Sequence, residues 1–122
     1  MTPFGQKLRA LRAARGVSLK RMAADLQLSA AYLSALEHGH RGLPSPALVV
    51  QVCEYFHLIW DDFEEMQRLA ALSHPRAVVD TAGMSPEHTE LANRLAREIG
   101  HLSQEQAGEL MAALERKLGR LG

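Results

Sequence analysis

Apolar residues along the chain recur every three or four positions, which is the spacing of one buried face of an α-helix. Seven such segments can be separated, and most of them begin with a Ser or Thr that can cap a helix. The first segment extends from Thr2 to Gly16 and carries Phe4, Leu8 and Leu11 on its inner face. Runs of strand-forming residues are almost absent. The pattern therefore predicts an all-α fold.

The segment 18–39 is the most informative part of the chain. Ser18 and Ser29 can each cap a short helix, and Gly39 can end the second helix in a left-handed conformation. The small side chain of Ala23 allows the two helices to cross closely. The apolar positions of this segment share one inner face: Met22, Ala23, Leu26, Leu28, Leu33 and Leu36. The pattern predicts a helix-turn-helix whose second helix has an outer face free to enter a DNA major groove.

Two further helices are predicted before residue 73. Ser45 precedes a Pro and is expected to cap the first of them, while Asp61 or Asp62 is expected to cap the second. Their inward positions are Leu48, Val49, Val52, Cys53 and Phe56 in the first helix, and Phe63, Met66, Leu69 and Leu72 in the second.

The rest of the chain predicts a helical hairpin. We expect a five-helix domain over 1–73, a connector over 74–84 and the hairpin over 85–122, with Gly100 ending its first helix and a capping box at Ser103 starting its second. A hairpin of this size cannot bury both faces alone, so its apolar stripe should pack on the N-terminal domain or on a second copy. The stripe consists of Leu91, Leu95, Ile99, Leu110, Met111, Leu114 and Leu118.

Composition narrows the class of protein. A hydrophobic fraction of 47% with 23% charged residues is typical of a folded globular protein. No apolar run approaches the roughly 20 residues that a membrane span needs, and charges interrupt the N-terminus where a signal peptide would be apolar. Cys53 is the single cysteine, so an intrachain disulfide cannot form. We therefore expect no membrane partner and a cytoplasmic location.

The formal net charge of zero hides a division of charge along the chain. Residues 1–45 carry seven basic and two acidic side chains, a net charge of +5, and residues 46–122 carry the compensating −5. A basic N-terminal part is typical of proteins that contact phosphate groups. The alternative is chance clustering of surface charge.

Three stretches carry a resemblance to a known family: FGQKLRALRAARGVS, RMAADLQLSAAYLSALEHG and PSPALVVQVCEYFHL. Over residues 4 to about 58 the chain resembles the phage-repressor family of the Cro/cI or XRE type. The resemblance implies a five-helix DNA-binding domain that acts as a homodimer, with an ion pair between Arg12 and Glu37. The alternative for Glu37 is a solvated surface acid. The family usually has Gly where this chain has Gln27, so we expect a cost of about 1 kcal/mol or an altered turn.

The resemblance also implies a DNA-binding surface. The base-reading positions of the family match Ala30, Ala31 and Ala35, and alanine can only touch a thymine methyl group. Few direct base contacts are therefore expected, and specificity should come from DNA shape and from other side chains. These are Ser29, Tyr32, Ser34, His38, His40 and Arg41.

Backbone contacts are expected from three cations of this surface. Lys20 and Arg21 lie in the first turn of their helix, where side chains and N–H groups can meet phosphates. Arg41 is the best single candidate for a phosphate or minor-groove contact. Tyr32 has an alternative position, with its ring packed between helices.

Other chemistry has little support in the sequence. His38 and His40 have no third ligand nearby, so we expect no metal, and no cofactor is expected either. Cys53 falls on an apolar face and is expected in the core rather than as a nucleophile. No glycine-rich phosphate loop or Ser/His/Asp set is present, so we do not expect an enzyme.

These observations favour a homodimeric transcriptional regulator that binds double-stranded DNA and whose hairpin supplies dimer contacts or senses a signal. Repression by occluding RNA polymerase is the default mechanism, and activation through the acidic half remains open. Two alternatives remain open. One is an antitoxin that binds operator DNA with one half and a toxin with the other. The second is a protein-interaction module that has kept the fold and lost DNA binding, which the three alanines allow.

Overall fold

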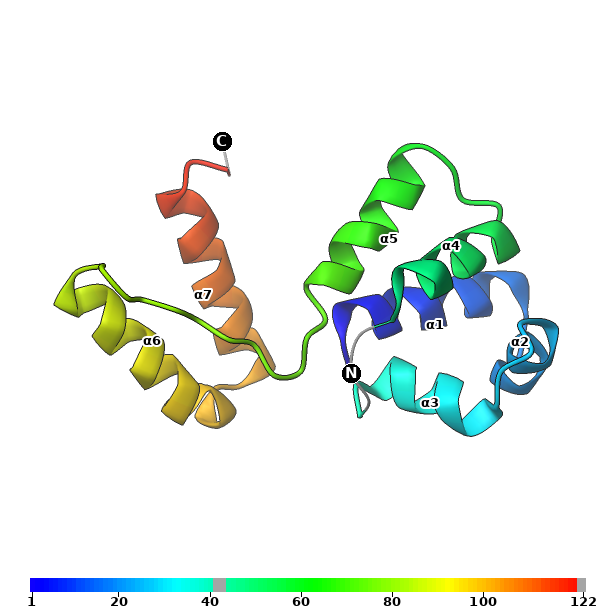
Figure 1. Ribbon diagram of the computed structural model, residues 1–122, viewed down its shortest axis with the longest axis horizontal. Helices are drawn as coiled ribbons and strands as arrows, with labels where there is room; N and C mark the ends of the chain where they lie inside the picture. The colour runs from blue at the N-terminus through cyan, green and yellow to red at the C-terminus, as the bar shows by residue number, and fades with distance from the viewer. Residues whose placement is uncertain (41–43, 121–122) are drawn as a thin grey trace. The chain divides into compact units, whose positions relative to one another are not determined.

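The computed structural model of the chain describes residues 1–40 and 44–120. This part is all-helical and contains no β-strand, which confirms the predicted fold class (Figure 1). It divides into two compact units, Met1–Ala77 and Val78–Gly122, and the division falls inside the segment predicted as a connector. The helices are α1 (Pro3–Arg15), α2 (Leu19–Asp25), α3 (Ala30–His38), α4 (Pro46–Tyr55), α5 (Asp61–Ala71), α6 (Pro86–Glu98) and α7 (Gln104–Lys117), with a 3-10 turn at Ile99–His101.

Most helices begin at a hydroxyl side chain. In six of them the Ser or Thr oxygen before the first turn accepts a hydrogen bond from a backbone N–H of that turn, which would otherwise be unpaired. At α7, the Gln106 side chain also accepts a hydrogen bond from the Ser103 N–H, which completes the predicted capping box. The capping residues are Thr2, Ser18, Ser29, Ser45, Ser85 and Ser103.

One core holds the N-terminal unit together. Contacts join α1 to α3 and α5, α2 to α3, and α4 to α5. The large apolar side chains that are fully buried come from all five helices: Phe4, Leu8, Met22, Leu33, Val52 and Met66. Nearly all of the predicted inward positions lie in this core or pack against it. The core therefore fixes α2 and α3 against each other and leaves the outer face of α3 to solvent.

Three expectations at the helix ends are wrong. Neither Asp61 nor Asp62 caps α5, because the cap position is Trp60, which has a φ of 53° and makes no side-chain cap hydrogen bond. Both carboxylates lie instead in the first turn, where the helix dipole favours negative charge. Gly100 does not end α6, because the α-helical bonds stop at Glu98 and the 3-10 turn follows. Leu72, which follows the last residue of α5, is 60% exposed instead of inward.

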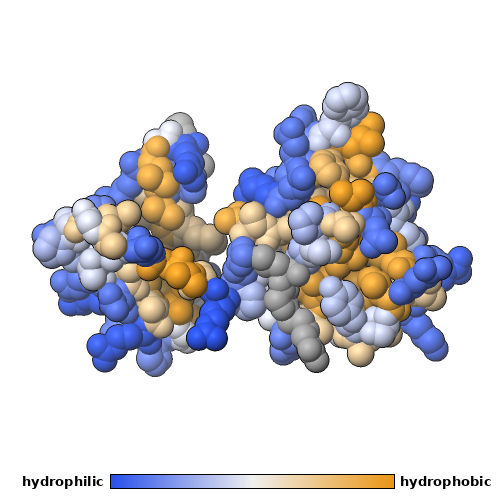
Figure 2. Space-filling model, in the orientation of Figure 1, coloured by the Kyte–Doolittle hydropathy of each residue, from blue (hydrophilic) through white to orange (hydrophobic). Residues whose placement is uncertain are grey.

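The C-terminal unit has no core of its own. Its two helices diverge from the 3-10 turn like the arms of a V (Figure 1). None of its described residues is buried, and apolar side chains remain at its surface (Figure 2). All seven residues of the predicted stripe are between 40% and 64% exposed. Across the described part of the chain, no helix combines the length and the apolar character that a membrane crossing requires.

Candidate nucleic-acid interface

The turn between α2 and α3 is built on a left-handed glutamine. Gln27 has a φ of 58°, and the N–H groups of Gln27 and Leu28 donate to the carbonyls of Ala24 and Ala23 at 3.1 and 2.8 Å. These two bonds are the pair that closes a helix through a left-handed residue. The turn therefore keeps the geometry that favours glycine, and Gln27 adopts it at a cost in strain.

The outer face of α3 holds most of the residues predicted to contact DNA. Ser29, Ala30, Ala31 and His38 are exposed, Tyr32 is 40% exposed, and Ser34 and Ala35 are half-buried. Tyr32 is therefore accessible from solvent. His40 is exposed just beyond the helix, and Arg41 lies outside the described residues.

Two of these side chains are already engaged within the chain. The Ser29 hydroxyl accepts the Tyr32 N–H at 3.0 Å, so it serves as the helix cap. His38 Nδ1 lies 2.8 Å from the Ser34 carbonyl oxygen, and the His38 and His40 rings stack with centroids 6.0 Å apart. The C-terminal end of α3 therefore presents a pair of stacked imidazoles.

An ion pair beneath this face joins α1 to α3. Arg12 Nε and Nη2 donate to the two Glu37 carboxylate oxygens at 2.7 and 3.0 Å, and Arg12 Nη1 donates to the Val17 carbonyl. Glu37 is only 1% exposed, so it is not a surface acid. The pair fixes how α3 lies against α1 and keeps the Glu37 charge away from solvent.

Close packing at the same crossing depends on Gly5, which the sequence analysis did not single out. A Cβ atom at this position would lie 2.1 Å from the Glu37 carbonyl oxygen, so any larger residue would push α1 from α3. A glycine inside a helical pattern is the signal that marks such a close approach.

Two of the three cations predicted to meet phosphates, Lys20 and Arg21, lie on α2. Lys20 is exposed, and the Arg21 side chain is 74% exposed. Arg21 Nε donates to both Asp25 carboxylate oxygens at 3.3 Å, and the Tyr55 hydroxyl donates to Asp25 at 2.6 Å. The Tyr55 hydrogen bond, followed by the Arg21 charge, holds the pKa of Asp25 below its ordinary value, and the same bond raises the pKa of Tyr55.

Ser73 and Arg15 connect helices of the unit that carries this surface, and sequence reasoning missed both. The Ser73 hydroxyl accepts the Phe4 N–H at 2.9 Å and donates to the Leu69 carbonyl, which ties the end of α5 to the start of α1. Arg15 donates to the Phe56 carbonyl at 2.7 Å at the end of α4. Neither contact has a local sequence signal, because each partner lies far away along the chain.

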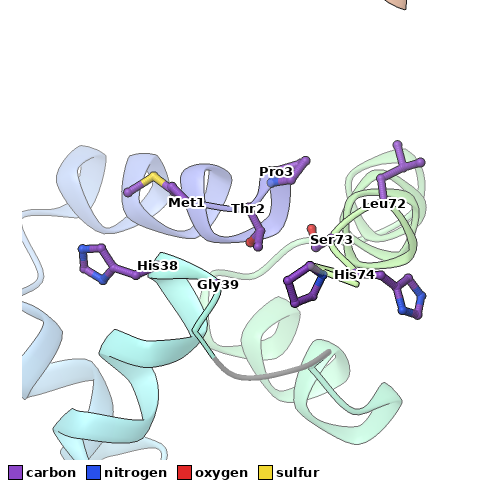
Figure 3. A pocket seen from close by; sticks show the side chains of 9 residues that line it. Met1, Thr2, Pro3, His38, Gly39, Leu72, Ser73 and His74 are labelled. Carbon is purple, nitrogen blue, oxygen red and sulfur yellow. The ribbon is translucent and has the colours of Figure 1, made fainter. Parts of the chain in front are cut away.

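A hollow opens where α1 begins and where α3 and α5 end (Figure 3). The His38 and His74 rings lie at opposite ends of it and point away from each other. In the part of the chain that the structure describes, no three His, Cys, Asp or Glu residues come together as a metal site. The hollow is lined by Met1, Thr2, Pro3, His38, Gly39, Leu72, Ser73, His74 and Pro75.

Comparison with known proteins agrees with this geometry. The model of the helix-turn-helix domain family matches residues 3–66, which includes α2, α3 and the turn between them. The chain belongs to this helix-turn-helix domain family. The family assignment confirms the resemblance to helix-turn-helix regulators that the sequence predicts.

Two curated relatives of this helix-turn-helix protein come from Bacillus subtilis (strain 168). It is 34% identical over 77 residues to the uncharacterized HTH-type transcriptional regulator RghRB, an alignment that covers 63% of this chain and 52% of the relative. It is 41% identical over 54 residues to the HTH-type transcriptional repressor RghR, covering 44% of this chain and 40% of the relative. The chain thus spans about half or less of the length of these relatives. No solved structure matches it significantly.

Proposed function

We propose that this helix-turn-helix protein is a transcriptional regulator that inserts α3 into the major groove of double-stranded DNA. The observation that carries the proposal is the outer face of α3, which is exposed on a helix packed against α1 and α2. The family and the names of both Bacillus relatives support it. Such a regulator acts in the cytoplasm, on the nucleoid.

The proposed contacts are mostly with the DNA backbone. Ala30, Ala31 and Ala35 let α3 approach the groove closely but supply no hydrogen-bonding group. Specificity then depends on DNA shape and on the few polar groups of the face. The proposed contact residues are Lys20, Arg21, Ser29, Ala30, Ala31, Tyr32, Ser34, Ala35, His38, His40 and Arg41.

A charge placed on α3 tests this function. Ala31→Glu puts a carboxylate on the proposed face, where phosphates would repel it, whereas Ala71→Glu makes the same change on an exposed residue of α5. We expect selection from a random duplex library to recover a common sequence with the wild-type protein and with Ala71→Glu. Ala31→Glu should recover none. Equal selection by both variants would show that α3 does not bind the duplex.

The hairpin supports a homodimer. Seven large apolar side chains of the hairpin are 40–64% exposed, in a unit without a single buried residue among those described. An apolar surface of this kind marks an interface, and a second hairpin offers the same stripe in return. The proposed dimer contacts are Leu91, Leu95, Ile99, Leu110, Met111, Leu114 and Leu118.

The oligomeric state of the full chain tests the hairpin. We expect light scattering to give twice the 13.5 kDa of one chain for the wild-type protein, and a monomer for Leu95→Glu. Val78→Glu is the matched control, because Val78 is 90% exposed and precedes the hairpin, so this variant should remain a dimer. A monomeric wild-type protein, or a dimeric Leu95→Glu, would show that this stripe does not join two copies.

Repression is the proposed outcome of DNA binding, by occlusion of RNA polymerase. The name of RghR, a transcriptional repressor, supports this choice over activation. The apolar hairpin also favours one rival function, that of an antitoxin whose C-terminal half covers a toxin. Co-purification of a small toxic protein with the full chain, together with a monomeric wild-type protein when it is alone, would support the antitoxin.

A further inference from the structure

Asp25, the last residue of α2, lies at the centre of a polar network that joins α2 to α4. The Tyr55 hydroxyl donates to Asp25 Oδ2 at 2.6 Å, and Arg21 Nε donates to both oxygens of the carboxylate at 3.3 Å. Two shallow surface hollows share Asp25 and Tyr55, and one of them extends to Arg21 and residues 16–18. The network is therefore open to a ligand rather than enclosed in the core.

Tyr55 is held in place from the core side. Its ring meets the buried ring of Phe56 edge-on, with centroids 5.1 Å apart and planes at 87°. The Arg15 guanidinium lies 5.7 Å from the centre of the Phe56 ring and donates to the Phe56 carbonyl. These contacts fix the end of α4, so the Tyr55 hydroxyl is a firm anchor for Asp25.

Arg21 is oriented at both its backbone and its side chain. Its N–H donates to the Ser18 hydroxyl at 3.0 Å, which fixes the first turn of α2. Within the described part of the chain, its side-chain hydrogen bonds involve Nε alone. The two terminal nitrogens remain for an outside acceptor, and a guanidinium can grip a phosphate through two parallel N–H bonds.

We propose that Tyr55 and Asp25 position the Arg21 guanidinium to bind a backbone phosphate of duplex DNA. The inference rests on the proposed function, because Arg21 is one of the residues proposed there to contact DNA. Tyr55 acts through Asp25 and touches no DNA, so it is a positioning residue. A guanidinium that is already oriented loses less rotamer freedom when it binds, which strengthens the contact. In return, Arg21 offsets the Asp25 charge, which would otherwise repel the phosphates.

Tyr55→Phe is the decisive variant, because it removes the anchor without changing any charge. We expect the full chain with Arg21→Gln to bind its selected duplex about tenfold more weakly than the wild-type protein. The salt slope, which is the fall of log K per unit of log salt concentration, should be smaller by about 0.9 for each Arg21. Tyr55→Phe should weaken duplex binding about three- to fivefold and should also reduce the salt slope. The double variant should bind no more weakly than Arg21→Gln alone, since both changes remove one contact.

A matched arginine on another helix serves as the control. Arg94 Nε donates to Glu90 four residues away at 2.8 Å, and its side chain is 69% exposed, much like Arg21. Arg94→Gln should leave the salt slope unchanged. Thermal unfolding of Tyr55→Phe separates the two possible roles, because a merely structural role lowers the melting temperature and leaves the slope as it is.

Each remaining result has a defined meaning. If Tyr55→Phe keeps the wild-type affinity and slope, or if the two losses multiply in the double variant, Tyr55 does not position Arg21. In both cases the DNA-binding function stands, because the wild-type protein binds. If the wild-type protein itself binds no duplex, the proposed function fails and the positioning role fails with it.

Discussion

At the scale of single residues, buried polar groups fix the surface that α3 presents. Glu37 is 1% exposed and is bonded by two nitrogens of Arg12, and Ser73 caps α1 from the end of α5. Among the described residues, no buried side-chain nitrogen or oxygen lacks a hydrogen-bond partner. Removing one partner of such a contact costs far more than removing a surface pair, because the other is left without water.

Glu37→Gln should therefore lower the free energy of unfolding by about 3 kcal/mol, since it leaves Arg12 charged and poorly paired. The matched control is Glu65→Gln, whose partner Arg68 is 59% exposed; this change should cost less than about 0.5 kcal/mol. Urea unfolding followed by circular dichroism measures both. An equal loss of unfolding free energy in the two variants would show that the buried pair stabilises the fold no more than the exposed pair does.

Acid should act on the network around Asp25. The Tyr55 hydrogen bond and the Arg21 charge hold the pKa of Asp25 below its ordinary value of 3.8. A lowered folded-state pKa contributes stability above the unfolded value, and this contribution is lost as the pH falls through the folded pKa. The difference in unfolding free energy between wild type and Asp25→Asn should thus be constant above about pH 5 and shrink below about pH 4. A constant difference down to pH 3 would contradict the shift.

At the scale of elements, helix starts could be predicted wherever the signal is local. Ser and Thr caps and the capping box of α7 lie within three residues of the N–H groups they satisfy, so the sequence displays them. The cap of α5 was predicted wrongly because Trp60, a residue that gives no capping signal, takes the positive-φ position before the helix. The Ser73 cap was missed because its partner Phe4 lies 69 residues away.

The left-handed turn at Gln27 offers a prediction at this scale. Gln27→Gly should raise the free energy of unfolding by about 0.5–1 kcal/mol, because glycine adopts this φ without strain while losing more backbone entropy. His57, with a φ of 56° at the end of α4, should respond in the same way to His57→Gly. Thermal and urea unfolding check both. A destabilised Gln27→Gly would mean that the glutamine side chain contributes more than the strain costs.

At the scale of the whole molecule, charge and apolar surface are segregated along the chain. The net +5 of residues 1–45 covers the helix-turn-helix, and the exposed apolar stripe belongs to the C-terminal unit. The positions of the stripe could be predicted from the helical spacing. The surface that packs against the stripe could not be predicted. A helical pattern indicates which residues avoid water, but it does not indicate which surface they contact.

The most direct test of the central claim is the salt dependence of duplex binding by the full chain. Two copies that each engage phosphates through Lys20, Arg21 and Arg41 should lose about 10³-fold in affinity between roughly 50 and 200 mM salt. Fluorescence anisotropy with the selected duplex measures this slope. A steep linear fall of log K with log salt is the predicted result, and the absence of binding to any duplex at about 50 mM salt would contradict the account.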